Sequence, residues 1–297
     1  MKKEKVMYVD LPKDAEYRKA YVTEDGKVAI EYAEEIAVDT INVSKTVSKA
    51  IPQITPLIGG TEVYKKEGTS YWYCRIKNGR DEFMYLYFGD LTVNDLLYDA
   101  KGRERKFITE EQRRFKANVI NSLQNMPKEG FRWIPVYEPS EDDGGNIQYV
   151  SGKYVLVGLN SYTWEEAFQK YSPENGSRMA SITTYFLLLL RLLKDGFATI
   201  EQLADDSADI GNYRDSYNAK ISDDLEKTGE RHQLGGLYGF AGNTCKIVKN
   251  SESSSGFSIL GGFFYTCGYK CPLAQVTHVI APDSTCSVGV GLLELTK

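Results

Sequence analysis

The sequence has very few of the residues on which hydrolytic enzymes depend. It contains two histidines in 297 residues, His232 and His278. A Ser/His/Asp hydrolase needs a histidine that is oriented by a carboxylate, and neither histidine accompanies a G-x-S-x-G nucleophile motif. Gly289-Val290-Gly291 lacks the rest of a phosphate-binding fingerprint. The sequence therefore predicts neither a hydrolase triad nor a phosphate-binding loop.

Long apolar runs and basic blocks are also missing. The most apolar run, Tyr185 to Leu190, ends at Arg191, whereas a membrane-spanning helix needs about 20 apolar residues. No apolar segment follows the charged stretch Met1 to Asp10, so no signal peptide is predicted. The net charge is −5 and basic runs are short, so nucleic-acid binding is not supported. We expect a protein that is cytoplasmic at synthesis, does not insert into membranes, and ends in a virion or surface assembly.

Cysteine is sparse, and its number is odd. Five cysteines argue against a framework in which every cysteine is paired in a disulfide, and reduced thiols are usual in the cytosol. Tyrosine, by contrast, is abundant, with 21 residues. Tyrosine offers a large contact area with few torsions to freeze and is favoured in binding surfaces, but it is equally favoured in strands. Both explanations of the excess stay open.

Three regions are expected along the chain. Residues 1–57 show little periodicity and are predicted to be an extended arm, which either docks on a neighbouring subunit or is a flexible lead-in. Residues 58–145 are predicted to form a smaller mixed α/β domain for attachment or assembly, and residues 146–297 a second domain. The polar stretch Glu138 to Gly145 marks the boundary between them.

Periodicity and turn residues predict an α+β fold. The buried helix is the clearest element, because residues 181–194 are apolar nearly all round. Asn78-Gly79 predicts a hairpin between two aromatic strands. Strands are expected at residues 26–32, 70–76, 82–88, 131–137 and 153–158, and helices at 92–99, 109–125 and 181–194, with further helix starts at Thr163 and Thr199.

Five short motifs follow one another in the C-terminal half. They are Tyr162–Ala167, Arg178–Ser181, Gly236–Asn243, Gly261–Phe264 and Gly291–Leu293. Their order and residues resemble the "sWeeA", "RLPT", "GLYDM.GNVWEW", "GGSW" and "GFR" motifs of the formylglycine-generating-enzyme family. The resemblance covers roughly residues 154–295, and it implies a C-type-lectin-like fold for the C-terminal domain.

Departures from these motifs indicate that the activity of the enzymes is not kept. Cys245-Lys246-Ile247 stands where the family has Trp-Glu-Trp, Ala180 replaces a proline and Leu293 replaces the terminal arginine. Such losses are expected of relatives that keep the frame and change the surface. The chain is most similar in character to the variable ligand-binding proteins of diversity-generating retroelements, found in phage tail fibres and bacterial surface proteins. That likeness implies a ligand-binding or receptor-binding protein that is not an enzyme.

Two kinds of cluster contain residue types that bind metals. In the enzymes, a cysteine pair after "GGS" binds copper(I), and soft thiolates suit that metal. Cys267 and Cys271 are separated by three residues where the family has four, so a copper oxidase stays the alternative and no cofactor is expected. Cys267, Cys271, His278 and Cys286 lack the paired spacing of structural zinc sites. The acidic runs 141–143 and 205–209 lack the spacing of an EF-hand and are predicted to be solvated loop charge.

The predicted binding face is the segment 263–286. In retroelement-diversified relatives, variable positions arise from adenine-mutated AAY codons, which yield the residue types that are common here. The expected ligand-binding residues are Phe264, Tyr265, Cys267, Tyr269, Lys270, Cys271, His278 and Asp283. If the segment is extended, Phe263 and Tyr265 point away from Phe264 and only one of the two sets is exposed.

Partners follow from the same resemblance. We expect a protein or glycan ligand on a cell surface, and a homo-oligomer or virion assembly formed through the N-terminal part. A purely structural virion component, in which the same face packs on a neighbouring subunit, is a further alternative.

Overall fold

Two separate units make up the chain, Met1–Ile54 and Thr55–Lys297. The computed structural model describes residues 6–7, 18–22, 28–32, 54–67, 69–216, 225–230, 232–251, 255–280 and 289–297. In the first unit these residues form an antiparallel sheet in the order β1-β2-β3. Its strands are β1 (Val6–Met7), β2 (Arg18–Val22) and β3 (Val28–Tyr32). The strand expected at residues 26–32 is therefore found, and the rest of the expected arm up to residue 53 lies outside the described residues.

One antiparallel sheet of the second unit is built from the aromatic strands. Its order is β4-β5-β6-β7. The strands are β4 (Tyr64–Lys65), β5 (Trp72–Ile76), β6 (Asp81–Tyr87) and β7 (Phe131–Pro135). Between β5 and β6, Lys77 and Asn78 have φ angles of 54° and 60°, a left-handed conformation that Asn tolerates. The hairpin expected at Asn78-Gly79 is thus confirmed.

The C-terminal part of the chain forms a second sheet. Its order is β15-β14-β13-β16, in which β16 runs parallel to β13. The strands are β13 (Cys245–Lys249), β14 (Phe257–Leu260), β15 (Val276–Ile280) and β16 (Gly289–Gly291). The chain then continues into β17 (Leu293–Glu294), which pairs with β10 (Arg178–Met179). Leu295 bridges to Trp133 of β7, so the C-terminal segment connects the two sheets.

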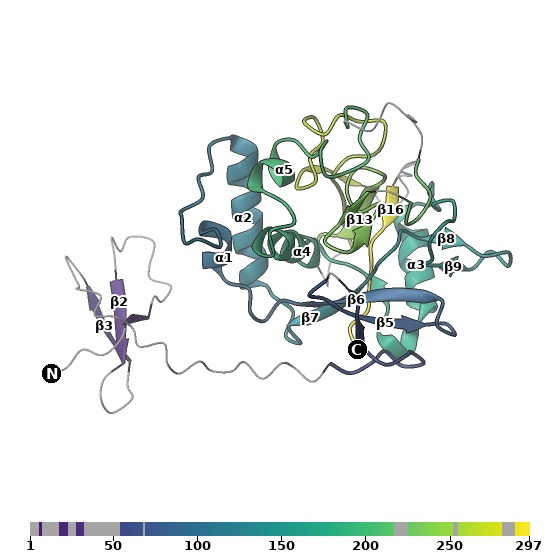
Figure 1. Ribbon diagram of the computed structural model, residues 1–297, viewed down its shortest axis with the longest axis horizontal. Coiled ribbons are helices and arrows are strands. Elements are labelled where there is room, and N and C mark those ends of the chain that lie inside the picture. The colour runs from purple at the N-terminus through teal and green to yellow at the C-terminus, as the bar shows by residue number, and fades with distance from the viewer. Residues whose placement is uncertain are drawn as a thin grey trace. The chain divides into compact units, whose positions relative to one another are not determined.

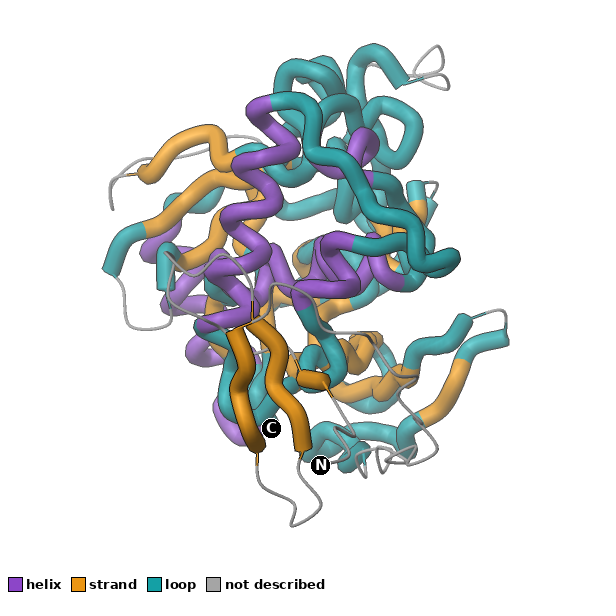
Figure 2. The backbone as a smooth tube through the Cα atoms, turned by 90° about the vertical axis from the view of Figure 1, so that its left-hand side faces the viewer, coloured by secondary structure: helices purple, strands orange, loops and turns teal. Residues whose placement is uncertain are grey.

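Helices pack against these two sheets and flank them (Figures 1 and 2). They are α1 (Val93–Leu97), α2 (Glu110–Gln124), α3 (Ser161–Tyr171), α4 (Ile182–Lys194) and α5 (Ile200–Ala204). Helix α4 is buried over nearly its whole length, as its apolar circumference predicts. Gly196 follows it with a φ of 78°, which is the left-handed C′ conformation that ends many helices.

A single core runs through the second unit. It joins Met84 and Ile134 of the first sheet, the leucines of α4, and Val248 and Leu260 of the second sheet. The boundary that we expected near residue 145 lies inside this unit, and core residues come from both sides of it. The short hairpins β8 (Ser140–Glu141) with β9 (Ile147–Gln148), and β11 (Gln233–Leu234) with β12 (Leu237–Tyr238), extend from this core.

Two sequence predictions were wrong in detail. Helix α3 begins at Ser161, because the Asn160 side chain accepts a hydrogen bond from the Thr163 N–H and caps the helix before the expected start. Residues 153–158 do not form a strand. The backbone N–H of Lys153 donates instead to the Thr228 hydroxyl, so this segment binds a distant loop and joins no sheet ladder.

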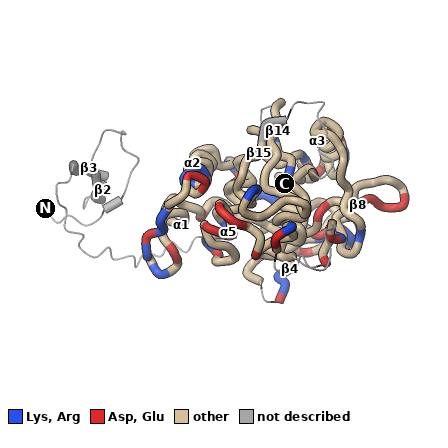
Figure 3. The backbone as a smooth tube through the Cα atoms, turned by 90° about the horizontal axis from the view of Figure 1, so that it is seen from above, with Lys and Arg blue, Asp and Glu red and all other residues tan. Residues whose placement is uncertain are grey.

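Both signs of charge occur throughout the second unit, and an acidic stretch lies in the hairpin at β8 (Figure 3). Across the described residues, no helix combines the length and apolarity that crossing a bilayer requires.

Truncation of the central helix should destabilise the second unit. Leu189 is 0% exposed in the core, so Leu189→Ala should lower the free energy of unfolding by about 3 kcal/mol through lost burial and the cavity left behind. Ile108→Ala is the matched control, because Ile108 is 72% exposed, and it should change stability by less than about 0.5 kcal/mol. Urea denaturation followed by tryptophan fluorescence measures both. Equal stability of the two variants would contradict the central position of α4.

Candidate ligand-binding site

Residues 263–275 of the predicted binding segment form an irregular loop (Figure 1), and β15 follows it. Between Phe263 and Thr266 the chain makes a tight turn, in which the Thr266 N–H donates to the Phe263 carbonyl at 2.8 Å. The Thr266 hydroxyl also accepts from the Phe263 N–H at 3.0 Å. The alternation expected for an extended chain is therefore wrong. Phe263 and Phe264 are both half-buried, and Tyr265 is exposed.

A second stretch of chain, residues 206–216, holds this loop in place. The Gly268 N–H donates to Asp215 Oδ1 at 2.8 Å, and the Arg214 N–H donates to the Thr266 carbonyl at 2.9 Å. Further along, the Ser207 hydroxyl accepts from the Leu273 N–H at 2.8 Å. Because these bonds fix the backbone at several points, the loop can present side chains without a regular element of its own.

Two tyrosines project from the loop. Tyr265 is 61% exposed and Tyr269 is 57% exposed, which is unusual for such large side chains. The Arg214 guanidinium lies 5.7 Å from the centre of the Tyr265 ring, and Lys270 Nζ lies 5.8 Å from that of Tyr269. Each ring is therefore paired with a cation at the surface. We call Tyr265, Tyr269, Lys270 and Arg214 the loop surface.

A hollow of about 210 Å³ lies next to the loop surface. Tyr269 and Lys270 line one side of it, and Arg114 and Asn118 of α2 line the other. The hollow thus adds the guanidinium of Arg114, the amide of Asn118 and the carboxylate of Glu111 to the loop surface. Together these groups can stack on a ring and both donate and accept hydrogen bonds.

A buried polar network lies under the loop and centres on Asn243. Its Oδ1 accepts from Asn212 Nδ2 at 3.0 Å and from the Glu226 N–H at 2.8 Å. Its Nδ2 donates to Glu138 Oε2 and to the Glu226 carbonyl. Asn243 is therefore fully hydrogen-bonded, and it ties three separated segments together below the Phe264 N–H, which donates to the Asn243 carbonyl at 3.3 Å.

An ion pair completes this network. Lys246 Nζ lies 2.9 Å from Glu138 Oε1, and both side chains are almost fully buried. The ammonium group also donates to the Gly239 and Thr244 carbonyls and to the Thr244 hydroxyl. The Thr244 hydroxyl donates to Glu138. Both charges are thus surrounded by hydrogen-bonding partners, which a buried ion pair needs if it is to offset the cost of its desolvation.

Several residues of the five sequence motifs pack in the helices and strands that support this network. An ideal Cβ at Gly291 would lie 2.9 Å from Trp164 and 2.8 Å from Phe168, so only glycine allows β16 to approach α3 this closely. Ser181 caps α4 through its hydroxyl and bridges to Lys249 of β13. These residues of the motifs therefore have structural roles.

Cys267 and Cys271 lie one turn apart, since the Cys271 N–H donates to the Cys267 carbonyl at 3.1 Å. Both are free and half-buried. Burial, and then the neighbouring Cys267, raises the pKa of the Cys271 thiol. A copper(I) site of the kind that the enzymes use needs thiolates, and metal binding releases protons from such thiols. No cluster of three or more His, Cys, Asp or Glu side chains suited to a metal ion occurs among the described residues.

The structure brings together part of the predicted site. Phe264, Tyr265, Cys267, Tyr269, Lys270 and Cys271 all lie on the one loop. The side chain of His278, in β15, and the whole of Asp283 and Cys286 lie outside the described residues. Sequence reasoning missed Arg214 and the α2 residues that line the hollow, because nothing in a single sequence pairs segments so far apart in the chain.

Comparison of the chain with protein-family models, with curated proteins and with solved structures gave no match in any of the three.

Removal of the central amide should destabilise the fold. Asn243→Ala removes the hydrogen bonds that the amide makes with Glu138, Asn212 and Glu226, and the loss of these buried bonds should cost about 3 kcal/mol in the free energy of unfolding. Asn94→Ala, at an exposed position in α1, should change it by less than about 0.5 kcal/mol. Urea denaturation distinguishes them. A loss below about 1 kcal/mol for Asn243→Ala would show that the network is dispensable.

The environment of Cys271 should appear in its reactivity. Because its pKa is raised, the thiolate forms at higher pH than in an exposed cysteine, whose pKa is about 8.5. Iodoacetamide labelling between about pH 7 and 10, followed by peptide mapping, should give a midpoint for Cys271 above that of the isolated peptide 265–273. Cys267→Ser should lower the midpoint, since the neighbouring sulfur contributes to the shift. A midpoint at or below that of the peptide would refute the assignment.

Proposed function

We propose that this protein is a non-enzymatic ligand-binding protein of the retroelement-diversified type, with a C-type-lectin-like frame and an exchangeable loop surface. The observation that carries the proposal is the contrast between the loop and its support. Tyr265 and Tyr269 are exposed, whereas the backbone that carries them is hydrogen-bonded to the 206–216 segment at several positions. A surface of this kind can change its side chains without loss of the fold.

The frame supports the proposal through the positions of the motif residues. Trp164 and Gly291 are in contact, Ser181 joins α4 to β13, and Asn243 lies under the loop. The residues that carry the resemblance thus contribute to packing or hydrogen bonding, while the segment between Gly261-Gly262 and β15 carries the exposed groups. This division is what a diversified binding protein requires.

The chemistry of the loop surface favours a protein ligand. Tyrosine and arginine are enriched among the residues that contribute most to protein–protein affinity, especially when they lie near the centre of an interface. Tyr265 beside Arg214, and Tyr269 beside Lys270, provide such pairs. The small hollow against α2 can receive one side chain of the partner. The first unit would then serve attachment or assembly, in a virion or on a bacterial surface.

Replacement of the exposed side chains should leave the fold intact. The triple variant Tyr265→Ala, Tyr269→Ala, Lys270→Ala removes no hydrogen bond of the frame, so its free energy of unfolding should change by less than about 1 kcal/mol. A library randomised at the same three positions and displayed on phage should yield binders to hen lysozyme. Replacement of residue 265 or 269 of such a binder by alanine should lower its affinity at least tenfold. Tyr154→Ala, at an exposed position outside the loop, is the control that should retain binding. An unfolded triple variant, or a library without folded members, would falsify the proposal.

The DNA around the gene provides an independent check on the diversified origin. We expect a near-copy of the segment that encodes residues 263–286 beside a reverse-transcriptase gene, with differences confined to adenine positions of the copy. A neighbourhood without both features would remove the retroelement part of the proposal and leave a binding protein of fixed specificity.

A further inference from the structure

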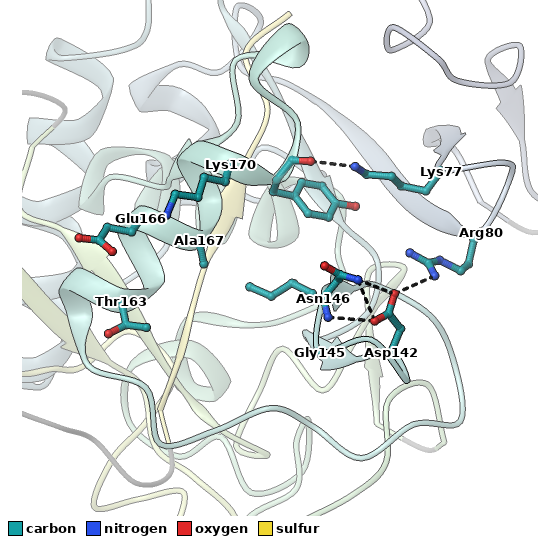
Figure 4. Close-up of a pocket in the computed structure, with 11 residues that line it drawn as sticks. Lys77, Arg80, Asp142, Gly145, Asn146, Thr163, Glu166, Ala167 and Lys170 are labelled. Carbon is teal, nitrogen blue, oxygen red and sulfur yellow. Dashed lines mark hydrogen bonds and ion pairs between the residues drawn. The ribbon is translucent and has the colours of Figure 1, made fainter.

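A pocket of about 560 Å³ lies outside the loop surface, among three segments that are far apart in the chain. Its walls come from the β5–β6 turn, from the hairpin between β8 and β9, and from helix α3 (Figure 4). Sites for small molecules usually have volumes of roughly 300–1,000 Å³. The size of this pocket therefore fits a compact organic ligand.

Two lysines line the pocket with hydrogen-bond donors to spare. Lys77 Nζ donates to the Tyr171 carbonyl at 2.9 Å and lies 5.0 Å from the centre of the Tyr171 ring. Because an ammonium group has three donors, two remain on Lys77 for a ligand. The Lys170 side chain, in the last turn of α3, makes no hydrogen bond or ion pair with any described residue. Both ammonium groups thus have N–H donors available to a ligand.

Arg80 is the third cation, and two carboxylates fix its position. Its Nε donates to Asp81 Oδ1 at 3.1 Å, and its Nη1 lies 3.6 Å from Asp142 Oδ2. Asp142 is in turn held by the hairpin, because its Oδ1 accepts from the backbone N–H groups of Asn146 and Gly144. These bonds, that from the Asn146 N–H first, hold the pKa of Asp142 below its usual range. Asp142 therefore stays ionised and orients Arg80, whose other guanidinium N–H groups face no described acceptor.

The opposite end of the pocket has a different character. Figure 4 shows Glu166 and Thr163 on one side, with Lys77 and Arg80 on the other and Ala167 and Asn146 between them. The Glu166 carboxylate forms no hydrogen bond or ion pair within the described part of the chain. It can accept hydrogen bonds from hydroxyl groups, and it would repel an anion placed beside it. A ligand with one anionic end and one hydroxylated end matches this arrangement.

We propose that this pocket binds a sugar that carries a single oxyanion, either a carboxylate or a phosphate. The oxyanion accepts charge-assisted hydrogen bonds from Lys77 and Arg80. The sugar hydroxyls donate to Glu166 and accept from Lys170 at the far end, and the apolar face of the ring lies over Ala167. The site is separate from the loop surface, so one chain would carry two kinds of binding site.

Calorimetric titration of the full chain with three sugars tests this proposal. The probes are glucuronate, glucose 6-phosphate and glucose, which share a ring and differ in the anionic group. At least one of the two anions should bind at least tenfold more tightly than glucose, and the comparison between them shows whether a carboxylate or a phosphate is preferred. Equal binding of all three sugars, or no binding of either anion at about 10 mM, overturns the proposal.

Variants locate the binding in this pocket. Lys170→Gln removes a charge that makes no contact within the described residues, so it should fold normally and weaken binding of the anionic sugar about tenfold. Lys77→Met keeps the aliphatic stem and should weaken it similarly. Lys128→Gln removes the same charge from an exposed position outside the pocket and should leave the affinity within about twofold. Wild-type affinity in Lys170→Gln and Lys77→Met, or an equal loss in Lys128→Gln, would reject the site. Tyr265 lies outside this pocket. Tyr265→Ala should therefore leave sugar binding unchanged, whether or not the proposed function of the loop surface holds.

Discussion

The buried contact between Glu138 and Lys246 is the constraint on which the display of the loops depends. Two opposite charges lie out of water at 2.9 Å, and their desolvation is tolerated only because Asn243 and Thr244 supply further hydrogen bonds to the carboxylate. These bonds need one arrangement of the backbone. Glu138 precedes the β8–β9 hairpin, and Lys246 lies in β13 of the second sheet, so the same contact fixes two parts of the unit relative to each other. A polar network that is fully satisfied favours one arrangement of the core over its alternatives.

Helix α4 gives that network a rigid support. Its leucines contact both sheets in one core, and its first turn is joined to β13 through Ser181 and Lys249. The irregular segments 206–216 and 263–275 therefore rest on regular elements that cannot shift independently. This explains how so much loop structure can be well defined in a unit whose strands are short.

The sequence could predict those elements whose cause is local. Helix α4 follows from its apolar circumference, α5 from the box formed by Thr199 and Gln202, and the β5–β6 hairpin from Asn78. It could not predict that residues 153–158 bind Thr228 in place of a neighbouring strand, because the apolar pattern is the same in both cases. The stretch around Tyr265 could be selected as a candidate site by its composition. Its contact with Arg214, and the pocket between Lys77 and α3, depend on the folded chain.

The path of residues 289–297 has a consequence for biosynthesis. β16 inserts beside β13, β17 pairs with β10, and Leu295 bonds to Trp133, so this last stretch closes sheets whose other strands left the ribosome much earlier. Contacts between positions so distant in the chain slow folding. The unit can therefore reach its final packing only after residues 289–295 have been synthesised. Until then the apolar faces of both sheets stay partly exposed to water. Exposed apolar surface of this kind makes a nascent chain prone to aggregation.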